Sequence, residues 1–171
     1  MVISLACVLV FSACGESRDT TAVKASPSPR VVECEGAETP APEASPTFEP
    51  AKILIQTDDR SVLIDGEVAE TPEQQAFGLM FRKSLPSDAG MVFLFFDPFS
   101  GGFYMKNTFI PLSIAYFDDK GVILKILDME PCEEDSTLYD PGVPYSGALE
   151  VNQGAFADLG VQEGDRITLT R

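Results

Sequence analysis

Residues 111–129, PLSIAYFDDKGVILKILDM, place two short apolar runs on either side of the polar tetrapeptide DDKG. Isoleucine, leucine, valine and aromatic residues favour extended strands, and a polar tetrapeptide that ends in glycine favours a turn. Two such runs joined by such a turn predict an antiparallel β-hairpin. The hairpin is the local pattern from which we predict the rest of the fold.

Similar short runs and turns recur on both sides of the hairpin. Residues 52–69 predict short strands, with TDDR and DG as turns, and MVFLFF at 91–96 predicts a buried strand that DPFSGG ends. FYMKNTF at 103–109 continues the strand-like pattern. Towards the C-terminus we expect a strand at ALEV (148–151), a short helix over 153–159 closed by glycine, and a strand at RITLT (166–170).

One further helix is predicted before MVFLFF. Thr71 suits the N-cap, Pro72 the first helical position, and Gln74 the third position of a capping box. Leu79 and Met80 continue one apolar face at helical spacing, so we expect the helix to run on until LPSDAG at 85–90.

Many short strands and little helix predict a mainly β (α+β) fold, a compact antiparallel sandwich or barrel-like domain with one or two short helices. The domain is expected to span residues 51–171, which is long enough for one hydrophobic core. Ten of the twelve phenylalanines lie between residues 77 and 156, and we expect them to supply this core.

The N-terminal residues indicate export and anchoring. Residues 1–14, MVISLACVLVFSAC, have the length and apolar character of a signal peptide, and FSAC resembles the bacterial lipobox, in which the cysteine is acylated. We expect Cys14 to carry the lipid; a plain secretory signal is the alternative. Residues 15–50, rich in Pro, Ser and Glu, predict a disordered tether. The expected protein is an extracytoplasmic lipoprotein anchored to the bacterial cell membrane.

Two cysteines remain for the exported part of the chain. Cys34 and Cys132 would meet oxidising conditions, so they are candidates for a disulfide. Two unpaired thiols are the alternative, because sequence alone gives no geometry.

Composition excludes several classes of site. The chain has no histidine, which excludes a Ser-His-Asp or Cys-His nucleophile and any histidine metal ligand. Its net charge of −15 disfavours nucleic-acid partners. No motif indicates a metal or cofactor, so we expect none.

The sharpest candidate site is the polar triplet Lys106, Asn107 and Thr108 inside an apolar run. One interpretation is a strand break, where amide and hydroxyl groups bond to the backbone. The other is the mouth of an apolar pocket, with Tyr104 and Lys106 beside it.

Two charged residues complete the candidate ligand-binding set. Arg82 either meets the helix dipole at the end of the predicted helix or binds an anion. Glu150 is an isolated charge in an apolar strand, and we expect it to pair with Arg82 or Lys106.

The segments at 70–95, 103–124 and 148–167 carry, in order, GLMFR, MKNTFIPL and LEVNQGAFADLGVQEGD. Together they resemble domain of unknown function family 192 over residues 51–171. The resemblance implies a compact, mainly β domain with short helices, frequent on exported bacterial proteins, and no established activity.

Three positions depart from the family pattern. Tyr104 stands where the family usually has tryptophan, and Ser113 where it usually has aspartate, so a carboxylate is absent there. The family often has a second cysteine soon after Cys132, and this chain has none. The resemblance therefore implies Cys34 as the partner of Cys132.

Three functions remain open at this stage. The favoured one is a binding domain for a small molecule, an envelope polymer or a protein partner, through the candidate residues Arg82, Tyr104, Lys106, Asn107, Thr108 and Glu150. A second is a lyase or hydrolase acting on an envelope carbohydrate, with Lys106 or Glu150 as acid–base groups. A third is a structural module with no pocket.

Overall fold

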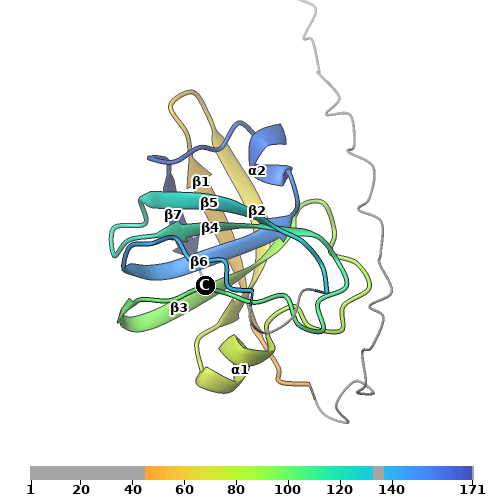
Figure 1. Ribbon diagram of the computed structural model, residues 1–171. Coiled ribbons are helices and arrows are strands. Elements are labelled where there is room, and N and C mark those ends of the chain that lie inside the picture. Colours follow the sequence, from red (N-terminus) through yellow and green to blue (C-terminus); the bar gives the residue numbers. More distant parts are fainter. Residues whose placement is uncertain (1–44, 133–136, 171) are drawn as a thin grey trace, which may run out of the picture.

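A computed structural model describes residues 45–132 and 137–170 (Figure 1). The elements in chain order are β1 (Glu49–Gln56), β2 (Ser61–Ala69), α1 (Pro72–Phe77), β3 (Ala89–Phe99), β4 (Leu112–Phe117), β5 (Ile123–Met129), β6 (Tyr145–Asn152), α2 (Ala155–Asp158) and β7 (Arg166–Thr170). Within these two stretches, no helix combines the length and the apolar character that crossing a membrane requires.

The seven strands form one sheet in the order β5-β4-β6-β3-β2-β1-β7. Every neighbouring pair is antiparallel except β2 and β3, which run parallel because α1 lies between them in the chain. This parallel pair differs from the antiparallel arrangement expected throughout. The mainly β, barrel-like class is confirmed.

The sheet curls into a half-barrel whose two edge strands meet at one end (Figure 1). The N–H of Ile167 in β7 donates a 2.7 Å hydrogen bond to the carbonyl of Gly121, next to β5. Gly121 has φ +78°, and a Cβ there would lie 2.1 Å from the Ile167 oxygen. The glycine of the DDKG turn is therefore required both for the turn and for the closure.

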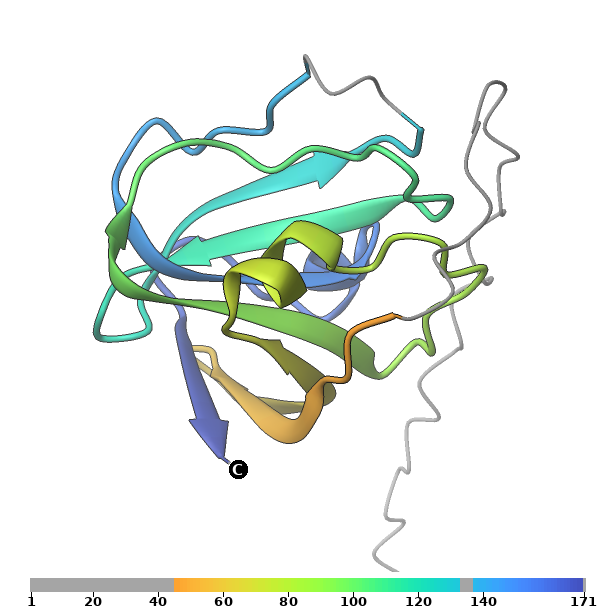
Figure 2. The same ribbon diagram turned by 90° about the horizontal axis from the view of Figure 1, so that it is seen from below.

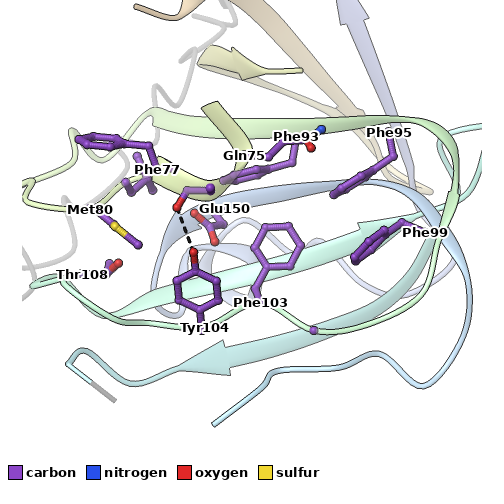
Figure 3. A pocket seen from close by; sticks show the side chains of 14 residues that line it. Gln75, Phe77, Met80, Phe93, Phe95, Phe99, Phe103, Tyr104, Thr108 and Glu150 are labelled. Atoms are coloured by element: carbon purple, nitrogen blue, oxygen red, sulfur yellow. Dashed lines mark hydrogen bonds between the residues drawn. The ribbon is translucent and has the colours of Figure 1, made fainter. Parts of the chain in front are cut away.

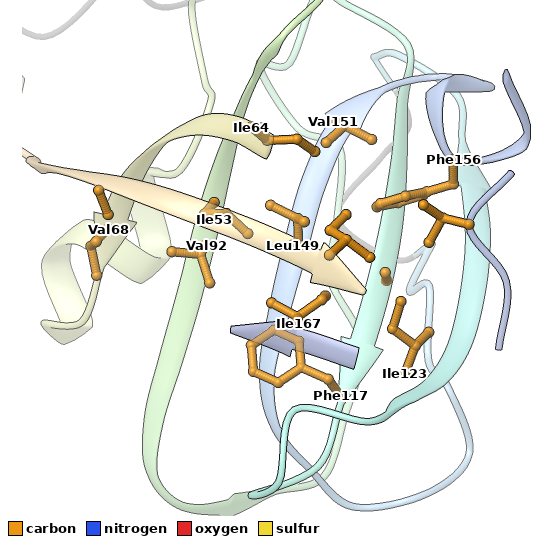
Figure 4. Close-up of a cluster of buried hydrophobic side chains, with 14 residues drawn as sticks. Ile53, Ile64, Val68, Val92, Phe117, Ile123, Leu149, Val151, Phe156 and Ile167 are labelled. Atoms are coloured by element: carbon orange, nitrogen blue, oxygen red, sulfur yellow. The ribbon is translucent and has the colours of Figure 1, made fainter. Parts of the chain in front are cut away.

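Both faces of the central strands are buried. Inside the curl lies a mainly aliphatic core (Figure 4), which contains Ile53, Ile55, Ile64, Val68, Val92, Leu149, Val151 and Ile167 together with Phe117 and Phe156. A second core covers the outer face of β3, β4 and β6. All six residues of β4 are buried for this reason. Figure 2 shows α1 in front of β3, β4 and β6.

The hairpin over β4 and β5 is confirmed, and so are the short final helix and strand. The turn predicted at Asp65 and Gly66 is wrong. Asp65 and Gly66 lie within β2, where Gly66 pairs with Ala51 and Gly90, and a Cβ on Gly66 would lie 2.4 Å from the Ile53 side chain. The glycine serves close packing in the inner core rather than a turn.

The predicted start of α1 is confirmed and its predicted end is wrong. The Thr71 hydroxyl accepts a hydrogen bond from the Gln74 N–H, and the Gln74 side chain accepts one from the Thr71 N–H, which completes the capping box. The helix ends at Phe77, because Gly78 has φ +49°. Leu79 and Met80 therefore belong to the following turn.

The N-terminal boundary lies slightly earlier than the tether prediction of 15–50. Strand β1 begins at Glu49, and Phe48 packs against the outer core. The signal peptide, Cys14 and Cys34 lie outside the described residues. Cys132 is disulfide-bonded, and its pairing with Cys34 stays a prediction.

Candidate functional site

A pocket of about 240 Å³ lies on the outer face of the sheet, between α1 and the segment 102–108 (Figure 3). Residues 75–80 of α1 and its following turn form one wall. The other lining residues are Phe93, Phe95 and Phe99 of β3, Gly102, Phe103, Tyr104 and Thr108, and Glu150 of β6.

Strand alternation places Glu150 in this pocket. Leu149 and Val151 face the inner core, so Glu150 between them faces outward, as does Ala148. Its cross-strand neighbours are Met91 of β3 and Ile114 of β4, both fully buried. Figure 3 shows the carboxyl directed into the space near Phe93, Phe103 and Tyr104.

The Glu150 side chain is buried within the sheet, and its carboxyl faces the pocket. It is 4 % exposed, and no described residue donates a hydrogen bond to it or forms an ion pair with it. Burial raises the pKa of Glu150 from 4.5 to about 8, and the positive charge of Arg82 opposes this rise. The group is therefore neutral at pH 7 and gains its charge in the mildly alkaline range.

Aromatic rings surround this carboxyl. Phe93 and Phe103 meet edge to face with ring centroids 4.9 Å apart, and Phe103 contacts Tyr116 at 5.7 Å. Phe95 stacks on Phe99 at 4.9 Å. These contacts fix the rings around the cavity, because edge-to-face and stacked pairs are favourable geometries.

Two walls of the pocket are joined by hydrogen bonds. The Tyr104 hydroxyl donates to the Ala76 carbonyl oxygen at 3.1 Å (Figure 3). The Gln75 amide donates to the Leu94 carbonyl oxygen at 2.6 Å, which fixes α1 to β3. Gly78 completes this wall, since a Cβ there would lie 3.2 Å from the Phe93 ring.

The polar triplet forms a turn rather than part of a strand. The N–H of Thr108 donates to the Met105 carbonyl at 3.1 Å, and Asn107 has φ +55°. The strand-break interpretation is confirmed, since Phe103 is bridged to Tyr139 and the strand-like pattern ends before the triplet. Asparagine tolerates this left-handed conformation better than most residues.

The structure brings together three of the six candidate residues. Tyr104, Thr108 and Glu150 line the pocket, whereas Arg82, Lys106 and Asn107 do not. Lys106 is exposed. The expected ion pair of Glu150 with Arg82 or Lys106 is wrong.

Arg82 is held elsewhere. Its guanidinium forms an ion pair with Glu67 of β2 and lies 5.8 Å from the centre of the Phe48 ring. It affects Glu150 only through space, by lowering its pKa. The wall at residues 75–80 and the rings of β3 were predicted as a helix face and as core, so their place in the pocket was not foreseen.

Ser113 lines a second pocket, of about 210 Å³, on another part of the sheet. Its hydroxyl accepts a 2.8 Å hydrogen bond from the Gly154 N–H before α2 and donates to the carboxylate of Asp128, its cross-strand partner. A carboxylate therefore reaches this position from β5. Within the described residues, no group of three or more Cys, Asp or Glu side chains is arranged to hold a metal ion.

Residues 53–169 match the model of the family DUF192, described as "Uncharacterized ACR". The chain belongs to domain of unknown function family 192. The match covers all seven strands at least in part and every residue that lines the Glu150 pocket.

Solved structures of similar proteins share the fold. One, from Sinorhizobium meliloti 1021, is described as a "putative transcription regulator"; it is 29% identical, with a TM-score of 0.70, over 74% of this chain and 98% of that one. Another, from Novosphingobium aromaticivorans DSM 12444, is described as a protein of unknown function; it is 31% identical, with a TM-score of 0.65, over 80% and 99%. No curated protein matches the chain significantly.

Proposed function

We propose that the domain is a binding module whose pocket takes an apolar group of a small molecule, an envelope polymer or a protein partner. The observation that carries this proposal is the aromatic cavity of about 240 Å³ with one inward-facing carboxyl, Glu150. Mostly apolar concave sites with few polar groups are typical of ligand pockets. Tyr104 and Thr108 supply further polar atoms on its lining.

The proposed location is outside the cytoplasm, at the bacterial membrane. The lipobox-like residues 11–14 support acylation of Cys14, and the Pro-rich segment after it supports a spacer between membrane and domain. Substitution of Cys14 by alanine should move the protein from the membrane fraction to the soluble fraction and abolish labelling by a fatty-acid analogue. Retention of both signals in this variant would contradict the anchor.

An enzyme acting on an envelope carbohydrate is a second candidate. The raised pKa of Glu150 favours it, since general acids are often carboxyls held neutral by burial. Glycoside hydrolysis usually needs two carboxyls, however, and Glu150 is the one carboxyl among the described residues of the lining. The single carboxyl favours binding over hydrolysis.

Nucleic-acid binding is disfavoured for this chain. The Sinorhizobium relative is described in terms of transcription, but a net charge of −15 opposes contact with a phosphate backbone.

A thermal-shift screen of small aromatic and alicyclic compounds tests the binding proposal. We expect hits that raise the melting temperature of the full chain and lose this effect in Phe99→Ala, which removes a lining ring. The matched control is Phe96→Ala, because Phe96 is fully exposed and does not line the pocket. Shifts that persist in Phe99→Ala, or no shift with any compound, would refute the pocket as a binding site.

A further inference from the structure

The chemistry of the pocket restricts the kind of ligand it takes. Glu150 is enclosed by rings and aliphatic side chains, and its oxygens have no partner among the described residues. Hydrogen-bonding groups of nearby side chains are already used. The Tyr104 hydroxyl donates to Ala76, and the Tyr116 hydroxyl donates to the Tyr139 carbonyl oxygen.

We propose that the ligand of this pocket carries a positive charge, an ammonium or guanidinium group on a small apolar body, with the Glu150 carboxylate as its counter-ion. The inference rests on the proposed function, since it names the ligand class of the same site. A lysine or arginine side chain of a partner and a free alkyl or aryl amine share this chemistry.

The first argument is electrostatic. Charge on a buried carboxyl is costly, so burial holds the acid in its neutral form. A cation placed beside Glu150 supplies the missing charge and hydrogen-bond donors, and the attraction is strong because the surroundings are apolar. A ligand carboxylate or phosphate in the same position would gain no counter-charge from Glu150.

The second argument comes from the rings. Phe93, Phe103 and Tyr104 border the cavity, and aromatic faces attract cations by their quadrupole. The cavity of about 240 Å³ is smaller than most drug-sized sites, which are about 300–1,000 Å³, so it suits one side chain or a small amine. A cavity that combines aromatic rings with one carboxyl therefore suits a positive charge carried on a small apolar group.

The charged and titratable groups around Glu150 leave this role to a ligand. From the turn after α1, Arg82 acts on Glu150 at a distance but is paired with Glu67. From β4 and β6, Tyr116 and Tyr145 face the same aromatic core, and burial raises the pKa of both phenols. Lys106 is exposed and does not line the cavity, and the facing residues of β3, Met91 and Phe93, do not titrate.

Three probes of similar size and different charge test the inference by calorimetric titration of the full chain. Benzylguanidinium is a cation with N–H donors at both pH values used, benzyl alcohol is neutral, and phenylacetate is an anion. We expect the cation to bind best and to bind about tenfold or more tightly at pH 9.5 than at pH 6.5, because Glu150 ionises between these values. Benzyl alcohol should show no such gain, and phenylacetate should bind most weakly.

Two matched variants separate Glu150 from the general acidity of the surface. Glu150→Gln keeps the shape of the side chain and should abolish both the preference for the cation and its pH dependence. Asp97→Asn removes an exposed carboxylate of β3 that does not line the pocket, and should leave both unchanged.

The outcomes distinguish the two proposals. Equal or tighter binding of benzyl alcohol, lost in Phe99→Ala, would overturn the cationic ligand and leave the binding module standing, with neutral Glu150 as a hydrogen-bond donor. Cation binding that survives Glu150→Gln would also overturn the inference. If none of the three probes binds at either pH, both proposals fail.

Discussion

The backbone N–H of Phe81 donates a 2.8 Å hydrogen bond to the carbonyl oxygen of Asn107, and both residues have left-handed backbone conformations. The bond ties the turn after α1 to the turn that contains the polar triplet. On the other side of the same turn, the N–H of Cys132, also left-handed, donates to the Thr108 carbonyl at 3.1 Å. The triplet therefore fixes the segments that form the rim of the pocket.

Substitutions at Asn107 test this role of the turn. Asn107→Ala should lower the free energy of unfolding by about 1 kcal/mol, because alanine is strained at φ +55°. Asn107→Gly should be neutral within about 0.5 kcal/mol, because glycine adopts this conformation freely. Urea denaturation of the two variants beside wild type measures both values. Equal losses in the two variants would show that the asparagine side chain, and not the backbone conformation, stabilises the turn.

The fold was largely predictable because its signals are local. The DDKG turn, the capping box at Thr71 and the alternation of the final strand each determine their own element. The parallel pairing of β2 with β3 has no such signal, since it joins two strands that are separated in the chain by α1. Gly66 was misread as a turn residue because the contact that requires glycine, with Ile53, is formed across the sheet.

The site was less predictable because it depends on which face each ring occupies. Of the ten phenylalanines from 77 to 156, only Phe93, Phe117 and Phe156 are buried, and Phe93 and several of the others line the pocket. Composition does not distinguish a core ring from a pocket ring. Glu150 was recognisable as an isolated charge in an apolar strand, but its expected partner, Arg82, forms its ion pair with Glu67 instead.

The Tyr104 hydroxyl is expected to restrain the pocket rather than to stabilise the whole fold. Tyr104→Phe removes its hydrogen bond to the Ala76 carbonyl and should cost about 1 kcal/mol or less, because the side chain is partly exposed. Hydrogen exchange should accelerate in residues 76–81 and stay unchanged in β6, which has its own ladder bonds. Uniform acceleration across the sheet would contradict a local role.

The predicted disulfide between Cys34 and Cys132 has a distinctive thermodynamic signature. Cys34→Ser and Cys132→Ser should lower stability equally, by up to about 4 kcal/mol, because either change opens the same long loop. The double variant should be no less stable than either single one. Denaturation under oxidising conditions and peptide mapping without reductant provide the measurements. A disulfide that still forms on Cys132 in Cys34→Ser would assign it another partner.

Glu150 should make the protein less stable as the pH rises. Its pKa is raised from 4.5 in the unfolded chain to about 8 in the fold, so the folded state holds a proton that the unfolded state has released. The stability from this proton is complete below pH 4.5, declines as the pH rises towards 8, and is fully lost above it. Glu150→Gln removes the loss, so the variant should exceed wild type by an amount that grows to on the order of 4 kcal/mol at pH 9.

Denaturation of both proteins from pH 5 to 9 measures this difference, in which all other titrating groups cancel. Glu163→Gln is a control of opposite sign, because a hydrogen bond from Lys125 lowers the pKa of the exposed Glu163. The stabilisation that Glu163 provides is present above its unfolded pKa of 4.5, so the gap between this variant and wild type should stay constant from pH 5 to 9 and close only in more acidic solution. A constant gap between Glu150→Gln and wild type from pH 5 to 9 would show that the carboxyl is not held neutral in the fold.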